Sequence, residues 1–446
     1  MAMSLFYPIL RRLALVALLA LSTLGYTYEF EVSTPEAAGY DPDKLASLNA
    51  IAEELYRDGR IPNYVIALYK DNKQFYKASK GLTGLAQGQP VDGSTIYHMA
   101  SMSKPIVSTA IFRLIQEGKL SFDDPLTKFF PQFSLMMVAP EGDFSNQFEP
   151  AEKEITILDL LTHTSGLSYN ETVAGFGDVG RQYSELGIFS AGVQRTLVEH
   201  IDVLAEIPLV AQPGSEFNYS VGIDVLGAII EQITEKTLAA YLKETIFDPL
   251  GMSNTAFYLT PDQAQNMASI FGMEPVAPQF PFEILGRLSP EPDATDWKIG
   301  GVIPASNFVK EPSFYSGGGG ILSSANDYAR YLTMIANGGE IDGVRILDEE
   351  YASMHQASLV PGLTSDAFRS AFGDAAEYMT FGGGFGIKRE PDNDDFVDYI
   401  FWAGAFNTFF WVDTKDNSIG LFLTAHWPVQ YNISDQLEEI VDEARL

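Results

Sequence analysis

The chain contains no cysteine, so disulfide bonds and thiolate chemistry are excluded. It is also short of positive charge, because 28 lysines and arginines stand against 59 aspartates and glutamates and leave a formal net charge of −31. A field of this sign repels nucleic acid and anionic lipid. We therefore expect no nucleic-acid partner. The acidic residues are spread along the chain, which indicates a solvated surface, with adaptation to a saline habitat as the alternative.

Long apolar runs are scarce, and only the N-terminus offers a candidate. Arg11 and Arg12 precede an apolar run over residues 13–24 that ends among small residues. This run is shorter than the roughly 20 residues that a membrane-spanning helix needs. The pattern predicts that residues 1–25 are a secretory signal peptide or an N-terminal anchor, with an apolar helix as the alternative. We expect an exported protein, periplasmic or extracellular, with no stable membrane span once the leader is removed.

Several common catalytic motifs are missing. No G-x-S-x-G elbow occurs, which argues against an α/β-hydrolase. No H-E-x-x-H motif or paired Cys/His cluster occurs either, so we expect neither a metal nor a cofactor. The glycine runs at 317–320 and 382–384 do not continue into G-K-[ST]. They indicate turns or close backbone approach rather than a phosphate-binding loop.

Hydrophobic spacing predicts helices and strands at both ends of the chain. A helix is expected over 42–58, a hairpin over 64–69 and 73–78, and a closing helix over 434–445. Short strands are expected at 381–388, 399–402, 409–412 and 419–425.

The middle of the chain, from about 120 to 300, is rich in helical patterns, and residues 270–312 are loop-like. This order predicts an α/β (α+β) fold with one sheet domain made of residues 30–95 and 310–446. A mostly helical domain over 96–309 would interrupt it and carry the motif residues described next.

The first chemical motif is S-x-x-K, formed by Ser101 and Lys104. Apolar spacing predicts a helix over 101–117 that Gly118 ends, so Ser101 would lie near its N-terminus. Three residues apart on a helix, a hydroxyl and an amine share one face. A lysine in a partly dry pocket can take the serine proton, and the helix dipole favours a developing oxyanion.

The other sequence segments that accompany S-x-x-K identify a protein family more specifically than this motif alone. Family-like segments follow one another in the order His98-Met-Ala-Ser-Met-Ser-Lys104, Leu158-Asp-Leu-Leu-Thr-His-Thr-Ser-Gly-Leu167, Phe217-Asn-Tyr-Ser220, Asp248-Pro-Leu-Gly-Met252, Ser316-Gly-Gly-Gly-Gly320 and Trp402-Ala-Gly404. With them the chain resembles the serine β-lactamase and penicillin-binding-protein superfamily over most of its length after the leader. It is most similar to the class C branch and to the β-lactamase-like family VIII carboxylesterases.

The resemblance implies a β-lactamase/transpeptidase-like fold, with an antiparallel sheet flanked by helices, a helical domain, and the site in the cleft between them. It implies that Ser101 is the nucleophile, Lys104 its proton partner, and Tyr219 the general base and later the acid for the leaving group. The backbone N–H groups of Ser101 and Ala405 would form the oxyanion hole. A nearby Lys104 ammonium would make the anion of Tyr219 accessible.

Two departures from the family pattern bear on the substrate. Val221 stands where the Y-x-N motif has asparagine, and valine cannot donate a hydrogen bond. Trp402, with Ala403 and Gly404, stands where true β-lactamases have K-T-G, so the lysine that would attract a carboxylate is absent. A site around Val221, Trp402 and Gly404, walled partly by residues 406–411, suits an uncharged apolar ester. Core packing is the alternative role for Trp402.

The sequence therefore predicts a serine hydrolase that acts through an acyl-enzyme, most of all a carboxylesterase for short to medium acyl esters. Its partner would be a small-molecule ester or amide. β-Lactamase, D-amino-acid peptidase and acyltransferase are the alternatives. A non-enzymatic cell-wall-binding relative is the least favoured, because Ser101, Lys104 and Tyr219 are all present.

His163, in the T-H-T-S-G segment, invites comparison with a Ser-His-Asp triad. The resemblance implies a structural role for this segment, so we expect His163 not to be catalytic. His426, next to Trp427, is a weaker candidate still.

Overall fold

The computed structural model describes residues 29–84, 88–171, 173–190, 192–274, 298–360, 379–390, 393–427 and 433–446. The predicted leader, residues 1–25, lies outside these ranges. Within them, no helix is both long enough and apolar enough to cross a bilayer.

The centre of the fold is an eight-stranded sheet in the order β1-β3-β2-β16-β15-β14-β13-β12. Its strands are β1 (Glu31–Val32), β2 (Asn63–Lys70), β3 (Lys73–Gly81), β12 (Met379–Phe381), β13 (Gly386–Glu390), β14 (Asn393–Gly404), β15 (Thr408–Asp413) and β16 (Ile419–Leu423). All neighbours are antiparallel except β1 and β3. The two ends of the chain therefore meet in one sheet, because β16 pairs with β2.

The hairpin between β2 and β3 forms as the sequence predicts. Asp71 and Asn72 both have positive φ, 52° and 59°, the combination that matches the twist of a two-residue hairpin. Side chains of β2 alternate between two cores, with Val65 and Ala67 on one side of the sheet and Ile66 on the other. Both faces of this strand are buried, so helices must cover the sheet on both sides.

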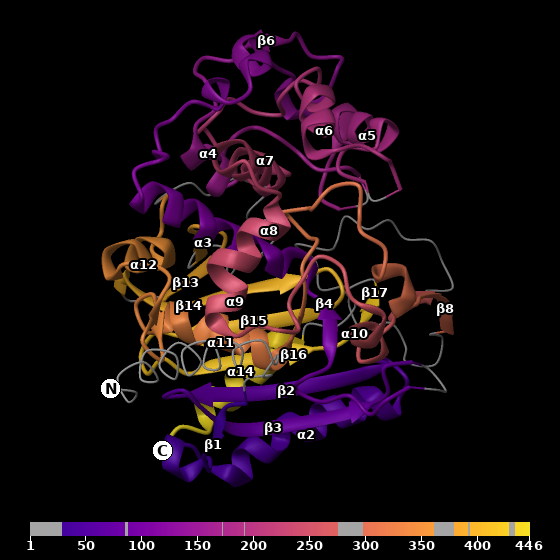
Figure 1. Ribbon diagram of the computed structural model, residues 1–446, viewed down its shortest axis with the longest axis vertical. Coiled ribbons are helices and arrows are strands. Elements are labelled where there is room, and N and C mark those ends of the chain that lie inside the picture. The colour runs from indigo at the N-terminus through magenta and orange to yellow at the C-terminus, as the bar shows by residue number, and fades with distance from the viewer. Residues whose placement is uncertain are drawn as a thin grey trace, which may run out of the picture.

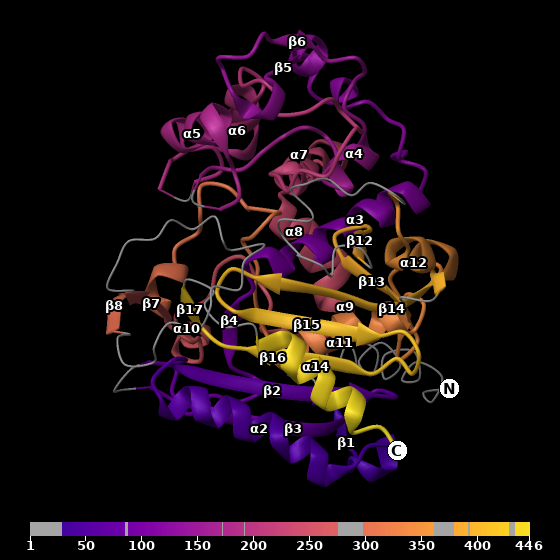
Figure 2. The same cartoon turned by 180° about the vertical axis from the view of Figure 1, so that it is seen from behind.

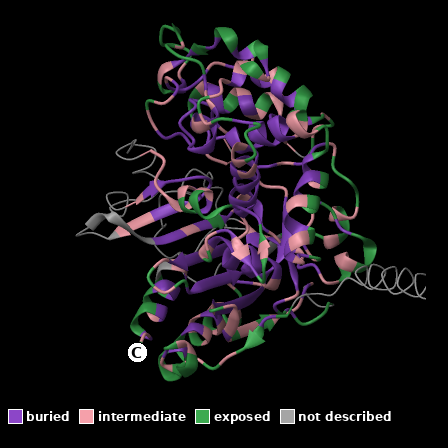
Figure 3. Ribbon diagram, turned by 60° about the vertical axis from the view of Figure 1, so that its left-hand side comes forward, coloured by how far each residue is buried: buried purple, intermediate pink, exposed green. Residues whose placement is uncertain are grey.

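Two helices from opposite ends of the chain, α2 (Pro42–Arg57) and α14 (Ile433–Glu443), cover one face. Figure 2 shows α14 crossing in front of the strands. On the other face lie α3 (Ser103–Gln116) and α11 (Ala325–Ala336), which belong to the larger core. Buried residues concentrate where these layers meet, and exposed residues line the outer turns of the helices (Figure 3).

The remaining helices are α4 (Ile157–Leu161), α5 (Gly177–Leu186), α6 (Leu197–Leu204), α7 (Gly222–Thr234), α8 (Leu238–Leu242), α9 (Asp248–Leu250), α10 (Pro261–Gln265) and α12 (Glu349–Gln356). Short helical turns are η2 (Glu36–Ala38), η3 (Ala100–Met102), η4 (Leu126–Lys128), η5 (Pro131–Leu135), η6 (Pro140–Gly142), η7 (Lys243–Phe247) and η9 (Ala305–Phe308). Helices α4 to α7 form a helical lobe at the top of both views, and α3 lies between this lobe and the sheet (Figures 1 and 2).

Small sheets tie the segments together. They contain β4 (Ile96–His98) with β9 (Leu322–Ser324), β5 (Met137–Val138) with β6 (Glu149–Pro150), β10 (Glu340–Ile341) with β11 (Val344–Arg345), and β17 (His426–Trp427) with β7 (Ile270–Glu274) and β8 (Lys298–Ile303). Residues 96–309 thus hold most of the helices but also several strands. The division into two domains stays a prediction.

The structure corrects two of the sequence expectations. The segment 381–388 is not one strand, because β12 ends at Phe381 and β13 begins at Gly386. Gly384, at φ 87°, lies in the turn between them and adopts a left-handed conformation that favours glycine. The segment 270–312 is not simply a loop, since β7 and β8 pair within it.

Candidate active site

Ser101 lies on a tightly held turn before α3. The preceding residue, Ala100, has φ 46°, an uncommon conformation for a residue with a side chain. Its N–H donates to Nδ1 of His98 at 3.1 Å, and the N–H of Met99 donates to the carbonyl of Ile321 at 3.0 Å. The predicted helix therefore begins with the short turn η3 and continues as α3 to Gln116, two residues before Gly118.

The structure brings together the three residues that the sequence singled out. Nζ of Lys104 donates to Oγ of Ser101 at 3.1 Å, and the hydroxyl of Tyr219 donates to the same Oγ at 2.8 Å. Lys104 is fully buried and its Nζ also donates to the carbonyl of Gly318 at 2.7 Å. Ser101 itself is partly exposed. Its Oγ thus has a candidate proton acceptor on one side and a candidate proton donor on the other.

Burial sets the protonation of both partners. It lowers the pKa of Lys104 from the usual 10.5 to about 7, although the charge of Asp224 acts in the opposite direction. It raises the pKa of Tyr219 above the usual value, against the lowering effect of the hydrogen bond to Ser101. That direction does not favour the anion of Tyr219, so the expectation that Lys104 makes this anion accessible stays a prediction. The neutral phenol is favoured, and the amine of Lys104 is the better proton acceptor near neutral pH.

Aromatic rings surround Lys104 and Tyr219 and bury both side chains away from solvent. The ring of Tyr219 lies 4.7 Å from that of His163, 5.2 Å from that of Tyr169 and 5.8 Å from that of Trp402. Nζ of Lys104 lies 4.6 Å from the centre of the Tyr219 ring and 5.5 Å from that of Tyr169. Trp402 is buried, which agrees with a packing role, and its contact with substrate stays a prediction.

The two histidines have no place in a triad with Ser101. His163 is buried, and its Nδ1 accepts the N–H of Ser220 at 3.2 Å. Its ring packs behind Tyr219 and burial holds its pKa well below the usual value, so it is a neutral packing residue. His426 is a buried residue of β17 in the small sheet.

The predicted oxyanion and substrate residues have different surroundings. Gly404 ends β14 against the Ser101 turn, where a Cβ atom would collide with the carbonyl of Met99. Ala405 follows directly and is partly exposed. Val221 precedes α7 inside the larger core and donates its N–H to the carbonyl of Ser168 at 3.2 Å. The roles of Ala405, Gly404 and Val221 toward substrate stay predictions.

Three further residues belong to the site and escaped the sequence analysis as functional candidates: Tyr169, Asp224 and Gly318. Asp224 is buried in the first turn of α7. Its sequence signal was available, since a carboxylate stands alone in the apolar stretch 221–230. Gly318 lies in the glycine run for which close backbone approach was predicted. A Cβ at neighbouring Gly317 would lie 2.6 Å from the carbonyl of Ile223, which confirms that prediction.

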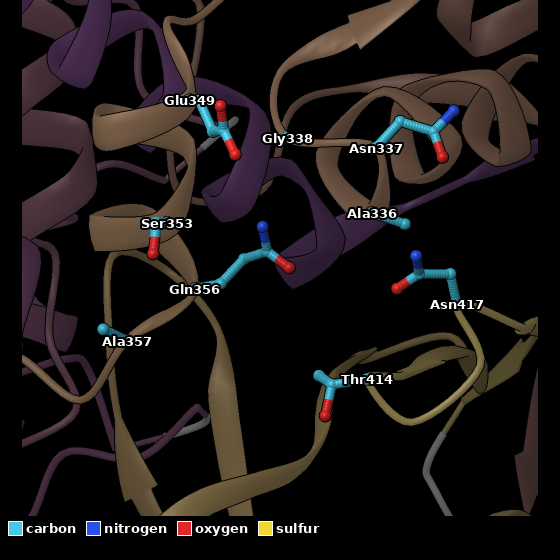
Figure 4. A pocket seen from close by; sticks show the side chains of 9 residues that line it. All are labelled: Ala336, Asn337, Gly338, Glu349, Ser353, Gln356, Ala357, Thr414 and Asn417. Carbon is cyan, nitrogen blue, oxygen red and sulfur yellow. The ribbon is translucent and has the colours of Figure 1, made fainter.

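A surface pocket of about 570 Å³ lies elsewhere, between α11, α12 and the β15–β16 turn. It is lined by Ala336, Asn337, Gly338, Glu349, Ser353, Gln356, Ala357, Thr414 and Asn417 (Figure 4). None of the predicted site residues lines it. Over the described ranges, no three His, Asp or Glu side chains are grouped so that they could hold a metal ion.

The fold is similar to that of a known hydrolase whose structure has been solved. The solved structure of EstCE1, described as a hydrolase with promiscuous acyltransferase activity, has a TM-score of 0.70 at 24% identity and covers 90% of this chain and 98% of its own. This likeness shows a β-lactamase/transpeptidase-like fold.

The model of the Beta-lactamase family matches residues 48–438. Protein Rv1367c of Mycobacterium tuberculosis is 31% identical over 85% of this chain and 89% of its own length. Esterase EstB of Burkholderia gladioli is 34% identical over 68% of this chain and 74% of its own. The chain belongs to the β-lactamase family, within the serine β-lactamase and penicillin-binding-protein superfamily, and is a serine hydrolase.

Proposed function

We propose that this enzyme is a carboxylesterase for uncharged esters of short to medium acyl chains and that it works through an acyl-enzyme on Ser101. The observation that carries the proposal is the position of Ser101 Oγ, in hydrogen-bond contact with both Lys104 Nζ and Tyr219 hydroxyl. The names of relatives add support. They include Esterase EstB and, at 26% identity, the lovastatin esterase of Penicillium rubens.

Acylation begins with proton transfer from Ser101 to the neutral amine of Lys104 as Oγ attacks the ester carbonyl carbon. The N–H groups of Ser101 and Ala405 stabilise the oxyanion. When the C–O bond to the alcohol breaks, Tyr219 gives its proton to the leaving oxygen and regains one from the Lys104 ammonium. The products are a free alcohol, an acylated Ser101 and a neutral Lys104.

Deacylation runs the same proton path with water in place of the alcohol. Water attacks the acyl carbon, and as Tyr219 takes one proton from it, Tyr219 passes its own proton to Lys104. The C–O bond to Ser101 then breaks, and the Lys104 ammonium returns that proton to Ser101 Oγ. The carboxylic acid is then released. No cofactor takes part in either half of the reaction.

The ester preference rests on the sequence departures at Val221 and Trp402. Val221 has no hydrogen-bonding group for the amide of a β-lactam, and Trp402 lacks the positive charge with which the lysine of the family motif would attract the carboxylate. Trp402 lies against the Tyr219 ring, so it is well positioned to shape the apolar wall beside the acyl group. An ester of a neutral acid therefore fits the site better than an antibiotic.

The test is hydrolysis of p-nitrophenyl acetate, butyrate and octanoate beside nitrocefin, for the intact protein and Ser101→Ala. We expect ester turnover that the substitution abolishes, together with loss of labelling by a fluorophosphonate probe. Ser103→Ala is the matched control, because Ser103 is the next serine of the motif and its Oγ accepts the N–H of Ile321 instead. It should keep the label.

Each other outcome points to a different function. Nitrocefin turnover that exceeds ester turnover would replace the esterase proposal with a β-lactamase. Acyl transfer to an added alcohol faster than hydrolysis would indicate an acyltransferase, and turnover of D-alanyl peptides alone would indicate a peptidase. An unlabelled, folded protein would return the non-enzymatic alternative.

We also propose export through the N-terminal leader, on the basis of the sequence pattern at residues 1–25 alone. N-terminal sequencing of the protein recovered from culture medium and periplasm tests this. A mature N-terminus shortly after residue 25 is the expected result, and an intact Met1 in the cytoplasm would contradict it.

A further inference from the structure

A buried carboxylate is linked to Lys104 through the backbone of one residue, Gly318. Asp224 is 1% exposed, and its Oδ1 accepts the hydroxyl of Ser316 at 2.6 Å and the N–H of Gly318 at 3.1 Å. Within the part of the chain that the structure describes, no lysine, arginine or histidine forms an ion pair with it. A buried charge with no counter-charge in contact is costly, so this carboxylate calls for an explanation.

The backbone of Gly318 joins Asp224 to Lys104. Its N–H donates to Asp224 and its carbonyl accepts from Lys104 Nζ at 2.7 Å. A Cβ at position 318 would collide with Oδ2 of Asp224, so a side chain there would have to displace the carboxylate. Hydrogen bonds therefore connect Asp224 to Ser101 without a break, by way of Gly318 and Lys104.

Lys104 and Asp224 are also coupled through their charges. The carboxylate of Asp224 favours the ammonium form of Lys104. Burial raises the pKa of Asp224, while the hydrogen bonds from Ser316 and Gly318 and the charge of Lys104 act in the opposite direction and favour its carboxylate form. The other titratable groups that face them are Tyr169, Tyr219 and His163, which burial keeps neutral. Asp224 is thus the one identified counter-charge for Lys104 among the described residues.

We propose that Asp224 is a positioning residue of the active site, which fixes Lys104 Nζ against Ser101 through the backbone of Gly318 and balances the ammonium formed during acylation. This inference rests on the proposed function. Asp224 stays a carboxylate throughout, while the proton of Ser101 moves to Lys104 and onward to the leaving group. Its charge acts most strongly when Lys104 is charged, which is the case after Ser101 has been deprotonated.

The decisive variant is Asp224→Asn, which keeps the shape and one acceptor oxygen but removes the charge. We expect kcat for p-nitrophenyl butyrate to fall on the order of 10²-fold with little change in KM. The acidic limb of the pH profile should move to lower pH, because loss of the negative charge lowers the pKa of Lys104. A merely structural role would not move this limb.

Two matched controls separate charge from packing. Ser316→Ala removes one hydrogen bond to Asp224 without a change of charge, and should leave the acidic limb in place. Asp327→Asn alters a second aspartate that is also 1% exposed and accepts the N–H of Asn254 and the hydroxyl of Thr255. It should reduce stability without shifting the limb.

A double variant keeps the test informative if Asp224→Asn folds poorly. Each of Lys104→Met and Asp224→Asn leaves one buried group without its counter-charge, whereas the double variant removes both. We expect the fall in Tm of the double variant to be smaller than the sum of the two single falls. If the falls in Tm are additive, the coupling between Lys104 and Asp224 is overturned. It is also overturned if a folded Asp224→Asn protein has the kcat and the acidic limb of the pH profile of the wild type.

These outcomes are distinct from failure of the proposed function. If Ser101→Ala keeps esterase activity, the proposed function fails, whatever Asp224 does. If Ser101→Ala is inactive and unlabelled while Asp224→Asn behaves as the wild type, the esterase mechanism stands and only the role of Asp224 is lost.

Discussion

Lys104 and Arg445 are two basic side chains that the fold draws away from solvent, and their surroundings are opposite. Arg445, after α14, contacts the carboxylates of Asp413, Asp416 and Asp442 directly. Lys104 contacts a hydroxyl, a carbonyl and two aromatic rings, and is linked to Asp224 only through the backbone of Gly318.

The consequence for protonation is equally opposite. Burial would lower the pKa of Arg445, but Tyr40 and the three carboxylates raise it above its usual value, so this charge is permanent. The pKa of Lys104 falls to about 7 because burial outweighs the distant Asp224. Direct contact with carboxylates keeps Arg445 charged, which suits a structural role. Lys104 has no carboxylate in direct contact, so it can gain and lose a proton near neutral pH.

The largest expected effect comes from removing the mobile charge. Lys104→Met should lower kcat/KM for p-nitrophenyl butyrate by about 10³-fold, because Ser101 loses its proton acceptor. The measurement is steady-state kinetics with a thermal-shift check of folding. Lys80→Met, at an exposed lysine paired with Glu53, is the control and should retain full activity. A Lys104→Met enzyme within tenfold of the wild type would mean that another group takes the proton.

Tyr219→Phe should cost about 10²-fold for alkyl esters, since the leaving alkoxide then lacks its proton donor. The loss should be much smaller for p-nitrophenyl esters, whose leaving group departs without protonation. The ratio of kcat/KM for ethyl butyrate to kcat/KM for p-nitrophenyl butyrate measures this difference, because both esters form the same acyl-enzyme and kcat/KM reports only the steps up to acylation. Equal losses on both substrates would assign Tyr219 to the deprotonation of Ser101 instead.

The pH profile should report Lys104 itself. The folded-state pKa of about 7 means that Lys104 is protonated below pH 7 and cannot accept the proton of Ser101. We expect kcat/KM to fall about tenfold for each pH unit below 7 and to level off above it. A limb near pH 4 would point to a carboxylate base and would contradict the assignment.

Features that depend on residues close together in the sequence could be predicted from it more directly than contacts between distant positions. The spacing of Ser101 and Lys104 and the turn at Asp71 and Asn72 are set within a few residues, and these expectations match the structure. The Ser101 to Tyr219 contact joins positions 118 apart, and the ordered family segments rather than periodicity made it predictable.

Long-range pairing accounts for what the sequence analysis missed. Strand β7 gains a partner from residues 426–427, more than a hundred positions away, and no periodicity within 270–312 could show it. The sequence could not show that burial raises the pKa of Tyr219, because Tyr169, His163 and Trp402 come together around it only in the fold. Asp224 was readable as an isolated carboxylate, but its link to Lys104 passes through Gly318.

Substitution of Arg445, whose charge is permanent, should have the smallest effect on activity and should instead lower stability. Arg445→Ala should leave kcat/KM for p-nitrophenyl butyrate unchanged and lower the free energy of unfolding by about 3 kcal/mol, because the buried Asp413 loses its partner. Urea unfolding at pH 7 measures the stability term. Loss of activity in proportion to stability would contradict the separation of the two cations.

The pH dependence of that stability follows from Asp416. Although burial raises it, hydrogen bonding to Ser418 and Lys70 and the charge of Arg445 lower the pKa of Asp416 from 3.8 to about 2. A depressed folded-state pKa gives stability that is complete above pH 4 and is lost as pH falls toward 2. The difference in unfolding free energy between wild type and Arg445→Ala should therefore shrink over this window. A difference that stays constant down to pH 2 would show that Arg445 acts through packing against Tyr40 rather than through its charge.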